Sequence, residues 1–400
     1  MSLQPIHALP LALACFTRVV PCAAEAADPP NAAQIAANCA YADKLFAERD
    51  YFQAAKEYRI VHRIFAHVLG ADHPETMAVH DKLAETFSID SRPDEEIPER
   101  RAILDRRLRM LGQDHPDTLA TMHKLAKKLM WEKEGEELFK RLLSIRRRIS
   151  GAEAPITLQT WQELAQTMSQ VDHEEAAETE FREILAIRRR ILGSEHRDTL
   201  NTQFWLAASL RDQKRYAEAD KEFSENLAIL ERIEDFHDPQ DPDNNPKVLI
   251  LMYLAGISYN EGRYEEQEAR LRKMIALRKL LDSKGRRYPA VPLFQSYAYV
   301  HLAESLLLQK KYAEAEVEYR AVLLLYDEKC HGKTHGIDSD VFNVCNKLAR
   351  SLKEQGKLQE ALEFTLRVEG AADIKVKQYK ALYDDAVKLR HEIEMAMERQ

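Results

Sequence analysis

One eight-residue phrase recurs along the chain and sets the spacing of the rest. It reads LGADHPET at 69–76, LGQDHPDT at 111–118 and LGSEHRDT at 192–199, with a degenerate copy, SGAEAPIT, at 150–157. A Leu-Ala pair begins seven residues after each of these threonines, and related pairs continue the series in both directions. The pairs begin at Tyr41, Leu83, Leu125, Leu164, Leu206, Leu254, Leu302 and Leu348, at intervals of 42, 42, 39, 42, 48, 48 and 46 residues. A near-constant period of this length is typical of a solenoid of stacked repeats.

Each repeat has the residue pattern of two packed helices. Only 12 of the 400 residues are glycine and 45% are apolar, which suits an all-helical chain. Ten residues after the first residue of each pair we expect the turn into a second helix, and Gly135 occupies that place in the third repeat. A small residue follows at +13 and a large one at +17 (Leu142 in the third repeat), so that one helix can approach its neighbour closely. The small residues are Ala54, Ala177, Ala219, Ala315 and Ala361.

The recurring phrase predicts how one repeat ends and the next begins. Gly70, Gly112, Gly151 and Gly193 fall where a helix ends, and we expect them in the left-handed helical conformation. Proline cannot continue a helix, and we expect the threonines that close each phrase to cap the helix that follows.

These residues resemble a known family. Leu-Ala with Tyr at +10, Ala at +13 and an aromatic residue at +17 is similar to the tetratricopeptide repeat, most closely in YAEAD at 216–220 and YAEAE at 312–316. The 42-residue period and the LGxxHPxT linker resemble the kinesin-light-chain subclass. The resemblance implies an all-α fold, a right-handed superhelix of about eight helix-turn-helix repeats with a C-terminal capping helix. We expect a leader at residues 1–30, the repeat array at 31–374 and the cap at 375–400.

The first 30 residues differ from the rest. An apolar run at 8–17 and small residues at 24–26 resemble a secretory signal peptide, although Arg18 interrupts the pattern and no basic residue precedes it. The sequence leaves export and a cytoplasmic location with an unstructured extension both open. No other stretch approaches the ~18 apolar residues that a membrane-spanning helix needs.

The sequence offers no catalytic or metal-binding motif. It contains no nucleophile elbow, HExxH motif or dinucleotide fingerprint, which favours a non-catalytic protein without a cofactor. Histidines at 73, 115, 196 and 335 recur at one place in successive linkers, too far apart for a shared ion. Cys330, His331, His335 and Cys345 have a spacing that zinc sites use, but the repeat register explains them as linker and core residues. The cysteines as a set predict free thiols rather than a disulfide framework.

The strongest functional prediction is a groove on the concave face, which the family resemblance assigns to the first helices. Its lining turns apolar and aromatic in repeats 5–7 and then polar and basic in repeat 8. The predicted lining is Phe204, Leu249, Met252, Tyr259, Tyr297, Val300, Asn343, Asn346, Arg350 and Lys353. We expect a peptide or helical segment of another protein to bind there, with Arg350 and Lys353 holding its acidic end. The alternative is that the C-terminal helix or a loop covers these residues.

Arginines near the ends of three second helices form the competing prediction. They are Arg107, Arg109, Arg146, Arg148, Arg188 and Arg190. Cations at helix C-termini are favourable in themselves, but a row of them could also bind an anionic ligand or nucleic acid. The formal charge of −8 argues against nucleic acid as the main partner. A regulatory subunit of an enzyme complex and a self-associating spacer also remain open.

Overall fold

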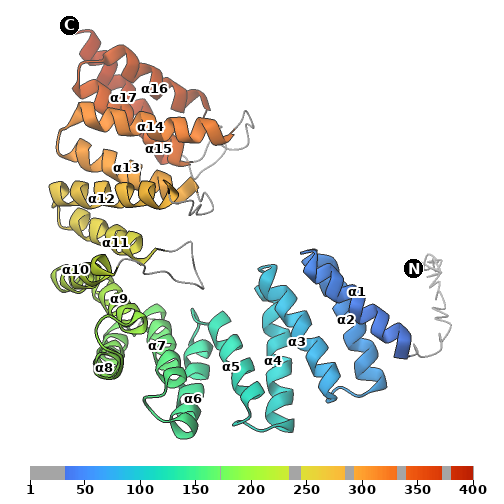
Figure 1. Cartoon of the computed structure of the whole chain (residues 1–400). Coiled ribbons are helices and arrows are strands. Elements are labelled where there is room, and N and C mark those ends of the chain that lie inside the picture. Colours follow the sequence, from blue (N-terminus) through green and yellow to red (C-terminus); the bar gives the residue numbers. More distant parts are fainter. Residues whose placement is uncertain are drawn as a thin grey trace, which may run out of the picture. The chain divides into compact units, whose positions relative to one another are not determined.

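The computed structural model describes residues 32–171, 173–233, 245–283, 292–330, 339–371 and 380–399. These residues form seventeen α-helices and no strand (Figure 1). The helices are α1 (Ala32–Ala47), α2 (Tyr51–Val68), α3 (Pro74–Ile89), α4 (Pro93–Met110), α5 (Pro116–Lys128), α6 (Lys133–Ser150), α7 (Pro155–Gln170), α8 (Glu174–Leu192), α9 (Arg197–Asp212), α10 (Tyr216–Arg232), α11 (Pro246–Asn260), α12 (Tyr264–Ser283), α13 (Pro292–Leu308), α14 (Tyr312–Cys330), α15 (Ser339–Glu354), α16 (Leu358–Ala371) and α17 (Lys380–Met397). None of them is long and apolar enough to cross a membrane. The predicted leader and the histidines at 331 and 335 lie outside the described residues.

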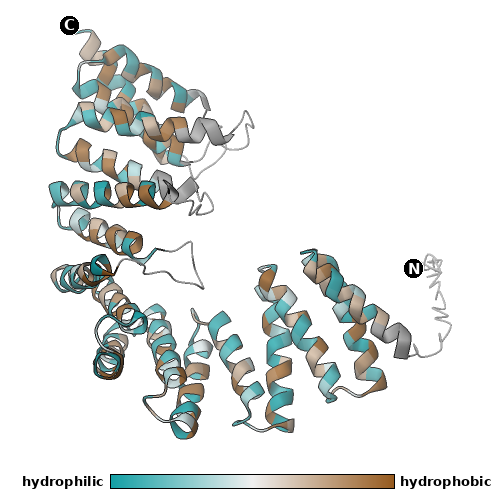
Figure 2. Cartoon of the chain, viewed as in Figure 1, coloured by the Kyte–Doolittle hydropathy of each residue, from teal (hydrophilic) through white to brown (hydrophobic). Residues whose placement is uncertain are grey.

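The chain divides into two compact units, Met1–Lys128 and Leu129–Gln400. Within each unit, every helix packs against the next one along the chain. Apolar residues follow the sides of the helices that meet their neighbours, and charged residues the other sides (Figure 2). The predicted small residues at +13 are fully buried, as are the aromatic residues at +17 in Phe181, Phe223 and Tyr319. The all-α array of helix pairs predicted from the repeat is therefore confirmed.

The linker works differently from the prediction, because histidine rather than threonine caps the next helix. The Nδ1 atoms of His73, His115 and His196 accept hydrogen bonds of 3.3, 3.2 and 3.1 Å from the backbone N–H two residues later. The threonines lie inside the first turn and are fully buried. Thr76, for example, donates from Oγ1 back to the carbonyl of Gly70 at 2.8 Å. The threonine therefore ties the helix to the linker, and the prediction that it caps the helix was wrong.

The linker glycines also differ from the expected conformation. Gly151 has φ 90° and ψ 157°, and Gly193 has φ 85° and ψ 166°. This extended backbone with positive φ is available to glycine almost alone, whereas asparagine could have replaced a residue in the left-handed helical region. These two linker positions are thus more strictly limited to glycine than expected.

The short third repeat loses its three residues at the end of its first helix. α5 spans 13 residues, whereas α3, α7 and α9 each span 16. The register of α6 shifts accordingly, so that Gly135 takes the small-residue position and not the predicted turn. A Cβ atom there would lie 2.1 Å from the Leu129 carbonyl oxygen. The same shift gives the large-residue position to Phe139, which is 1% exposed, instead of the predicted Leu142.

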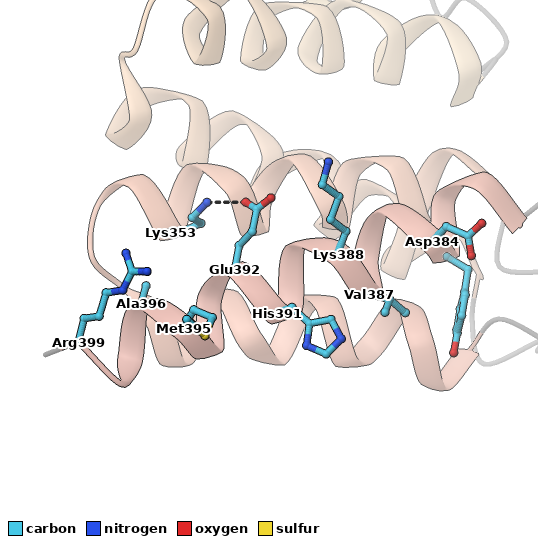
Figure 3. Close-up of a pocket in the computed structure, with 10 residues that line it drawn as sticks. Lys353, Asp384, Val387, Lys388, His391, Glu392, Met395, Ala396 and Arg399 are labelled. Carbon is cyan, nitrogen blue, oxygen red and sulfur yellow. Dashed lines mark hydrogen bonds and ion pairs between the residues drawn. The ribbon is translucent and has the colours of Figure 1, made fainter.

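The last described helix, α17, packs against both helices of repeat 8, α15 and α16. Its residues Ala386, Leu389 and Ile393 are buried. Lys353 of α15 donates from Nζ to Glu392 of α17 at 2.7 Å (Figure 3). α17 falls within the predicted capping segment, of which residues 375–379 and 400 lie outside the described part of the chain.

Buried carboxylates connect successive repeats of the second unit, and we call this series the acid–base ladder. A carboxylate near the start of each second helix contacts a basic residue beside the start of the next second helix. The pairs are Glu136–His173 at 3.1 Å, Glu178–Arg215 at 2.6 Å, Asp220–Arg263 at 3.0 Å, Glu268–Lys311 at 2.8 Å and Glu316–Lys357 at 2.6 Å. In repeat 8 the equivalent position holds Leu362.

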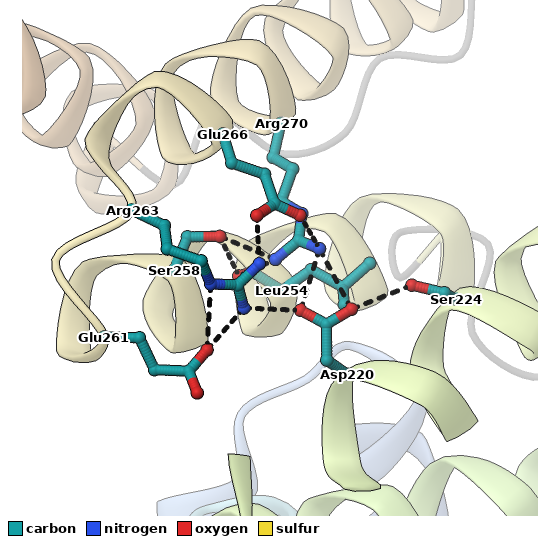
Figure 4. Close-up of polar contacts among 8 residues, drawn as sticks. All are labelled: Asp220, Ser224, Leu254, Ser258, Glu261, Arg263, Glu266 and Arg270. Carbon is teal, nitrogen blue, oxygen red and sulfur yellow. Dashed lines mark hydrogen bonds and ion pairs between the residues drawn. The ribbon is translucent and has the colours of Figure 1, made fainter. Parts of the chain in front are cut away.

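The Asp220 step of the acid–base ladder shows how such a carboxylate is satisfied (Figure 4). Its oxygens accept hydrogen bonds from Arg263 at 3.0 Å, from Arg270 at 2.8 Å and from the Ser224 hydroxyl at 3.1 Å. Burial raises the pKa of Asp220, but the two arginines lower it more, so that this pKa lies below its ordinary value. The ladder therefore contains charged groups that are paired within the protein and are not offered to a ligand.

Candidate functional site

Three of the six predicted ridge arginines are internal contacts between repeats. Arg188 of α8 is 4% exposed and donates to the Asp198 carbonyl at 2.9 Å and to the Thr202 hydroxyl at 2.7 Å, both on α9. Arg146 of α6 is 8% exposed and donates to Thr160 of α7 in the same way. In the first unit, the equivalent Arg107 pairs with Asp81 and donates to Thr121.

The other three predicted ridge residues, Arg109, Arg148 and Arg190, are exposed. Arg190 pairs with Glu153. Only half of the six arginines predicted for the ridge are therefore exposed. The structure thus separates the arginines that hold the repeats together from those that water reaches.

Aromatic side chains of α9, α10 and α11 form a cluster where these three helices of repeats 5 and 6 meet. The Phe204 ring lies 5.5 Å from Phe223 and 5.3 Å from Tyr253, centroid to centroid. Phe204 is half-buried and Phe223 is fully buried, so the cluster is anchored in the core. Edge-to-face contacts of this kind hold rings in fixed orientations. Tyr253 is consequently presented on a rigid support.

A cavity of about 340 Å³ opens over this cluster. We call it the tyrosine pocket. Its aromatic and apolar walls are Tyr216, Tyr253 and Tyr297 together with Met252, from α10, α11 and α13. Gly256 and Asn260 continue the wall along α11, and Arg211, Asp212 and Lys214 form its charged side. A volume of this order lies at the lower end of the range of ligand sites and suits a side chain or two.

Arg211 gives the tyrosine pocket its polarity. Its guanidinium lies 4.3 Å from the centroid of the Tyr253 ring, and its Nε donates to Asp212 at 2.9 Å. A guanidinium held over a ring by such a contact keeps a defined direction for its remaining donors. Burial raises the pKa of Tyr297, although Arg211 opposes the shift, so that the Tyr297 hydroxyl stays a hydrogen-bond donor at neutral pH. The pocket thus combines aromatic walls with oriented donors.

The predicted groove residues fall into separate environments. Met252 and Tyr297 line the tyrosine pocket, and Phe204 supports it from behind. Leu249, Val300 and Asn343 are half-buried. Tyr259 is 40% exposed and lies beside Tyr264, outside the pocket lining.

The polar end of the predicted groove is occupied by α17. Asn346 is 1% exposed and donates from Nδ2 to the Leu382 carbonyl at 2.9 Å. Arg350 pairs with Asp385, and Lys353 pairs with Glu392. These three side chains therefore already have partners within the chain, as the covering alternative had allowed.

Sequence reasoning missed the whole charged side of the tyrosine pocket, Arg211, Asp212 and Lys214. Arg211 lies five residues after Leu206, the same offset at which the predicted groove residues Tyr259 and Lys353 follow Leu254 and Leu348, so its position was available from the repeat register. Tyr253 directly precedes Leu254 and contacts Phe204 of the preceding first helix, a position that the predicted groove lining did not include. Lys214 lies in the turn between α9 and α10, where its φ is 61°.

The described residues contain no group of His, Cys, Asp and Glu side chains that could hold a metal ion. Among them, Cys39 and Cys345 are not joined in a disulfide.

Consecutive helix pairs that pack one against the next are the architecture of helical repeat proteins. Residues 157–198, one 42-residue period, match the tetratricopeptide repeat family. This segment of the chain is therefore a tetratricopeptide repeat, and the resemblance to that family drawn from the sequence is confirmed. Repeats of this family commonly serve as scaffolds for protein–protein interaction.

Solved structures of several repeat proteins resemble the chain. The apo form of RapI is 11% identical, with a TM-score of 0.54 over 81% of this chain and 86% of that one, a likeness of fold alone. Repeats of a putative kinesin light chain from Podosopora anserina are 23% identical, with a TM-score of 0.45 over 50% of this chain and 96% of that one. BtubC (BKLC) from P. vanneervenii is 18% identical, with a TM-score of 0.44 over 63% and 93%. No curated protein matches the chain in sequence.

Proposed function

We propose that the protein is a non-catalytic scaffold that binds a peptide or helical segment of a partner protein along the first helices of repeats 5–7. The observation that carries the proposal is the tyrosine pocket, in which three tyrosines and Met252 form the walls beside Arg211 and Lys214. Aromatic residues on a rigid support supply binding energy without a large entropic loss, which is why they dominate binding hot spots. The partner would insert an apolar or aromatic side chain there.

The charged side of the pocket determines which kind of residue the partner carries next to the side chain that it inserts. Arg211 and Lys214 outnumber Asp212, and the Arg211 side chain is oriented by its contact with Tyr253. A carboxylate of the partner would accept hydrogen bonds from these cations. In this proposal Arg211 and Lys214 bind the acidic residue of the partner, the role first predicted for Arg350 and Lys353, which are paired with residues of α17.

The groove extends from the pocket along neighbouring first helices. Tyr259, 40% exposed, and the half-buried Leu249, Val300 and Asn343 would contact flanking residues of the partner. The competing function, binding of an anionic ligand through the arginine ridge, loses support because Arg107, Arg146 and Arg188 are engaged between repeats.

Selection from a random peptide library on the purified protein tests the proposal. We expect enriched peptides to pair an aromatic or large apolar residue with an acidic one. Tyr297→Ala and Arg211→Glu should each weaken their binding at least about tenfold, or about 1.4 kcal/mol. Tyr41→Ala, an exposed tyrosine of the first unit, is the matched control and should bind normally. Enriched peptides that bind the two pocket variants as tightly as the wild type, with circular dichroism unchanged, would exclude the pocket.

A further inference from the structure

Apart from its buried side, α17 carries a row of largely apolar side chains, which we call the apolar row and which the described residues leave partly exposed. Tyr383, Val387, His391 and Met395 are spaced four residues apart and so lie along one side of the helix. They line an open cavity of about 1010 Å³, the face drawn in Figure 3, and Met395 is 50% exposed. The inner side of α17 is already used, because Ala386, Leu389 and Ile393 are buried. The apolar row is therefore a second surface of the same helix.

The charges beside this row are arranged so that the helix complements itself. In chain order they are Asp384, Lys388, Glu392 and Arg399, alternating acid and base. A two-fold axis that crosses α17 at position 390 would lie about 3 Å along the helix from both Lys388 and Glu392. Lys388 of each copy would then face Glu392 of the other. Glu392 binds Lys353 through Oε2, and a carboxylate has two oxygens for donors.

The outer pair follows the same symmetry. Asp384 lies about 9 Å before the axis, and Arg399 lies in the turn after α17, at least about 10 Å past the axis, a mismatch of a few ångströms that a long arginine side chain can span. Among the described residues neither side chain has a hydrogen-bond or ion-pair partner that would have to be displaced, and both side chains are exposed. The Tyr383, Val387 and Met395 side chains would interdigitate between these pairs, as rows at four-residue spacing do in packed helices.

We propose that α17 is the interface of a symmetric homodimer, in which two copies pack their apolar rows antiparallel and exchange Lys388–Glu392 and Asp384–Arg399 ion pairs. Because the same residues serve both copies, such an interface is closed and does not extend into a fibre. It leaves the tyrosine pocket of each copy on other helices and does not depend on the function proposed for it.

Sedimentation velocity of the full chain over a range of concentrations tests the dimer. We expect a concentration-dependent species with the mass of two chains. Val387→Asp should raise its dissociation constant at least about tenfold, and Lys388→Glu should weaken it by opposing Glu392 of the second copy. Lys380→Glu, an exposed reversal on the same helix outside the apolar row, should leave the dimer intact.

A charge exchange checks the geometry separately from general damage. Asp384→Arg should weaken the dimer, and the double variant Asp384→Arg with Arg399→Asp should restore it. Circular dichroism of each variant confirms that α17 remains folded. A wild-type chain that stays monomeric overturns the proposal, because a partner of another kind or another segment of the chain then covers the row. A dimer that Val387→Asp leaves unchanged, or that the charge exchange fails to rescue, overturns it as well.

Discussion

Arg188 of α8 and Thr202 of α9 are joined by a 2.7 Å hydrogen bond that crosses from one repeat to the next. The same guanidinium donates to Gln162 of α7, so that one side chain connects three helices. Burial lowers the pKa of Arg188, and a cation in this position is stabilised only by the acceptors that surround it. The contact is repeated by Arg146 and Thr160 one repeat earlier.

Replacing Arg188 should therefore destabilise the second unit strongly. For Arg188→Met we expect a loss of about 2–4 kcal/mol in the free energy of unfolding, because Gln162, Thr202 and the Asp198 carbonyl each lose a hydrogen-bond donor inside the protein. Urea unfolding followed by circular dichroism measures the loss. Arg190→Met, two residues away and exposed, is the control and should change stability by less than about 0.5 kcal/mol. Equal losses of unfolding free energy in the two variants would show that the contacts of Arg188 between repeats do not stabilise the protein.

Gly135 should tolerate no side chain. In Gly135→Ala the new Cβ would lie 2.1 Å from the Leu129 carbonyl oxygen, so the backbone at the start of α6 must move. We expect a loss of about 1–3 kcal/mol, the usual cost of overpacking. Gly370→Ala in α16 meets nothing within 4 Å and should gain about 0.5–1 kcal/mol from helix propensity. Thermal unfolding of the two variants should shift in opposite directions, and a shift of Gly135→Ala to higher temperature contradicts the close approach.

The histidine caps predict a reciprocal pair of substitutions. His196 caps α9 with φ −67° and ψ 139°, and Ala154 begins α7 with φ −62° and ψ 141° but without a side-chain hydrogen bond. Since the two backbones match, His196→Ala should cost about 1 kcal/mol and Ala154→Asp should gain about as much. Chemical unfolding of both variants checks this. If Ala154→Asp is no more stable than the wild type, the linker backbone is not preorganised for a cap.

Mild acid should weaken the first unit through His62. Its ring centroid lies 4.3 Å from that of His80, and its Nε2 is buried without a hydrogen-bond partner among the described residues. Burial, with His80 and Arg106 adding to it and Glu99 opposing, lowers the pKa of His62 from 6.5 to about 4. Between these values the unfolded chain binds a proton that the folded chain does not. Stability therefore falls as the pH drops from about 6.5 to 4.

The variant His62→Leu isolates this contribution from the other groups that titrate in acid. Glu99 is among them, because the hydrogen bond from His80 lowers its pKa and its stabilising effect is lost at still lower pH. The difference in unfolding free energy between pH 7 and pH 4.5 should be smaller in His62→Leu than in the wild type. His67→Leu, exposed on the same helix, should keep the wild-type difference. An unchanged pH dependence in His62→Leu excludes His62 as its source.

The repeat pattern was sufficient to predict the fold because burial in a solenoid follows sequence spacing. Leu83, Ala219 and Tyr319 are buried at the offsets that their repeats predicted. The prediction for the third repeat was wrong at Gly135, because the three missing residues could have been lost anywhere between Leu125 and Gly151. Only the length of α5 shows where they were lost.

The candidate site was harder to predict, since exposure depends on neighbours that the register does not name. Arg188 and Arg190 look alike in sequence, yet one is buried by α9 and the other faces water. Arg350 and Lys353 were predicted to line the groove but are paired with α17, whose position does not follow from the repeat spacing. Arg211 lies at a groove offset too, and its importance depends on its contact with Tyr253.

The acid–base ladder gives the repeats of the second unit a direction. Each repeat from the third to the seventh supplies a carboxylate to its successor, while Leu362 supplies none. If one interior repeat were deleted, the carboxylate of the repeat before it would meet the basic residue of the repeat after it. The ion pairs of a shortened array should therefore remain complete. Moving the eighth repeat inward would instead place Leu362 against a lysine or arginine that has lost its counter-charge. The eighth repeat is thus specialised as a terminus, and recombination among these repeats can change the length of the array but not the order of its ends.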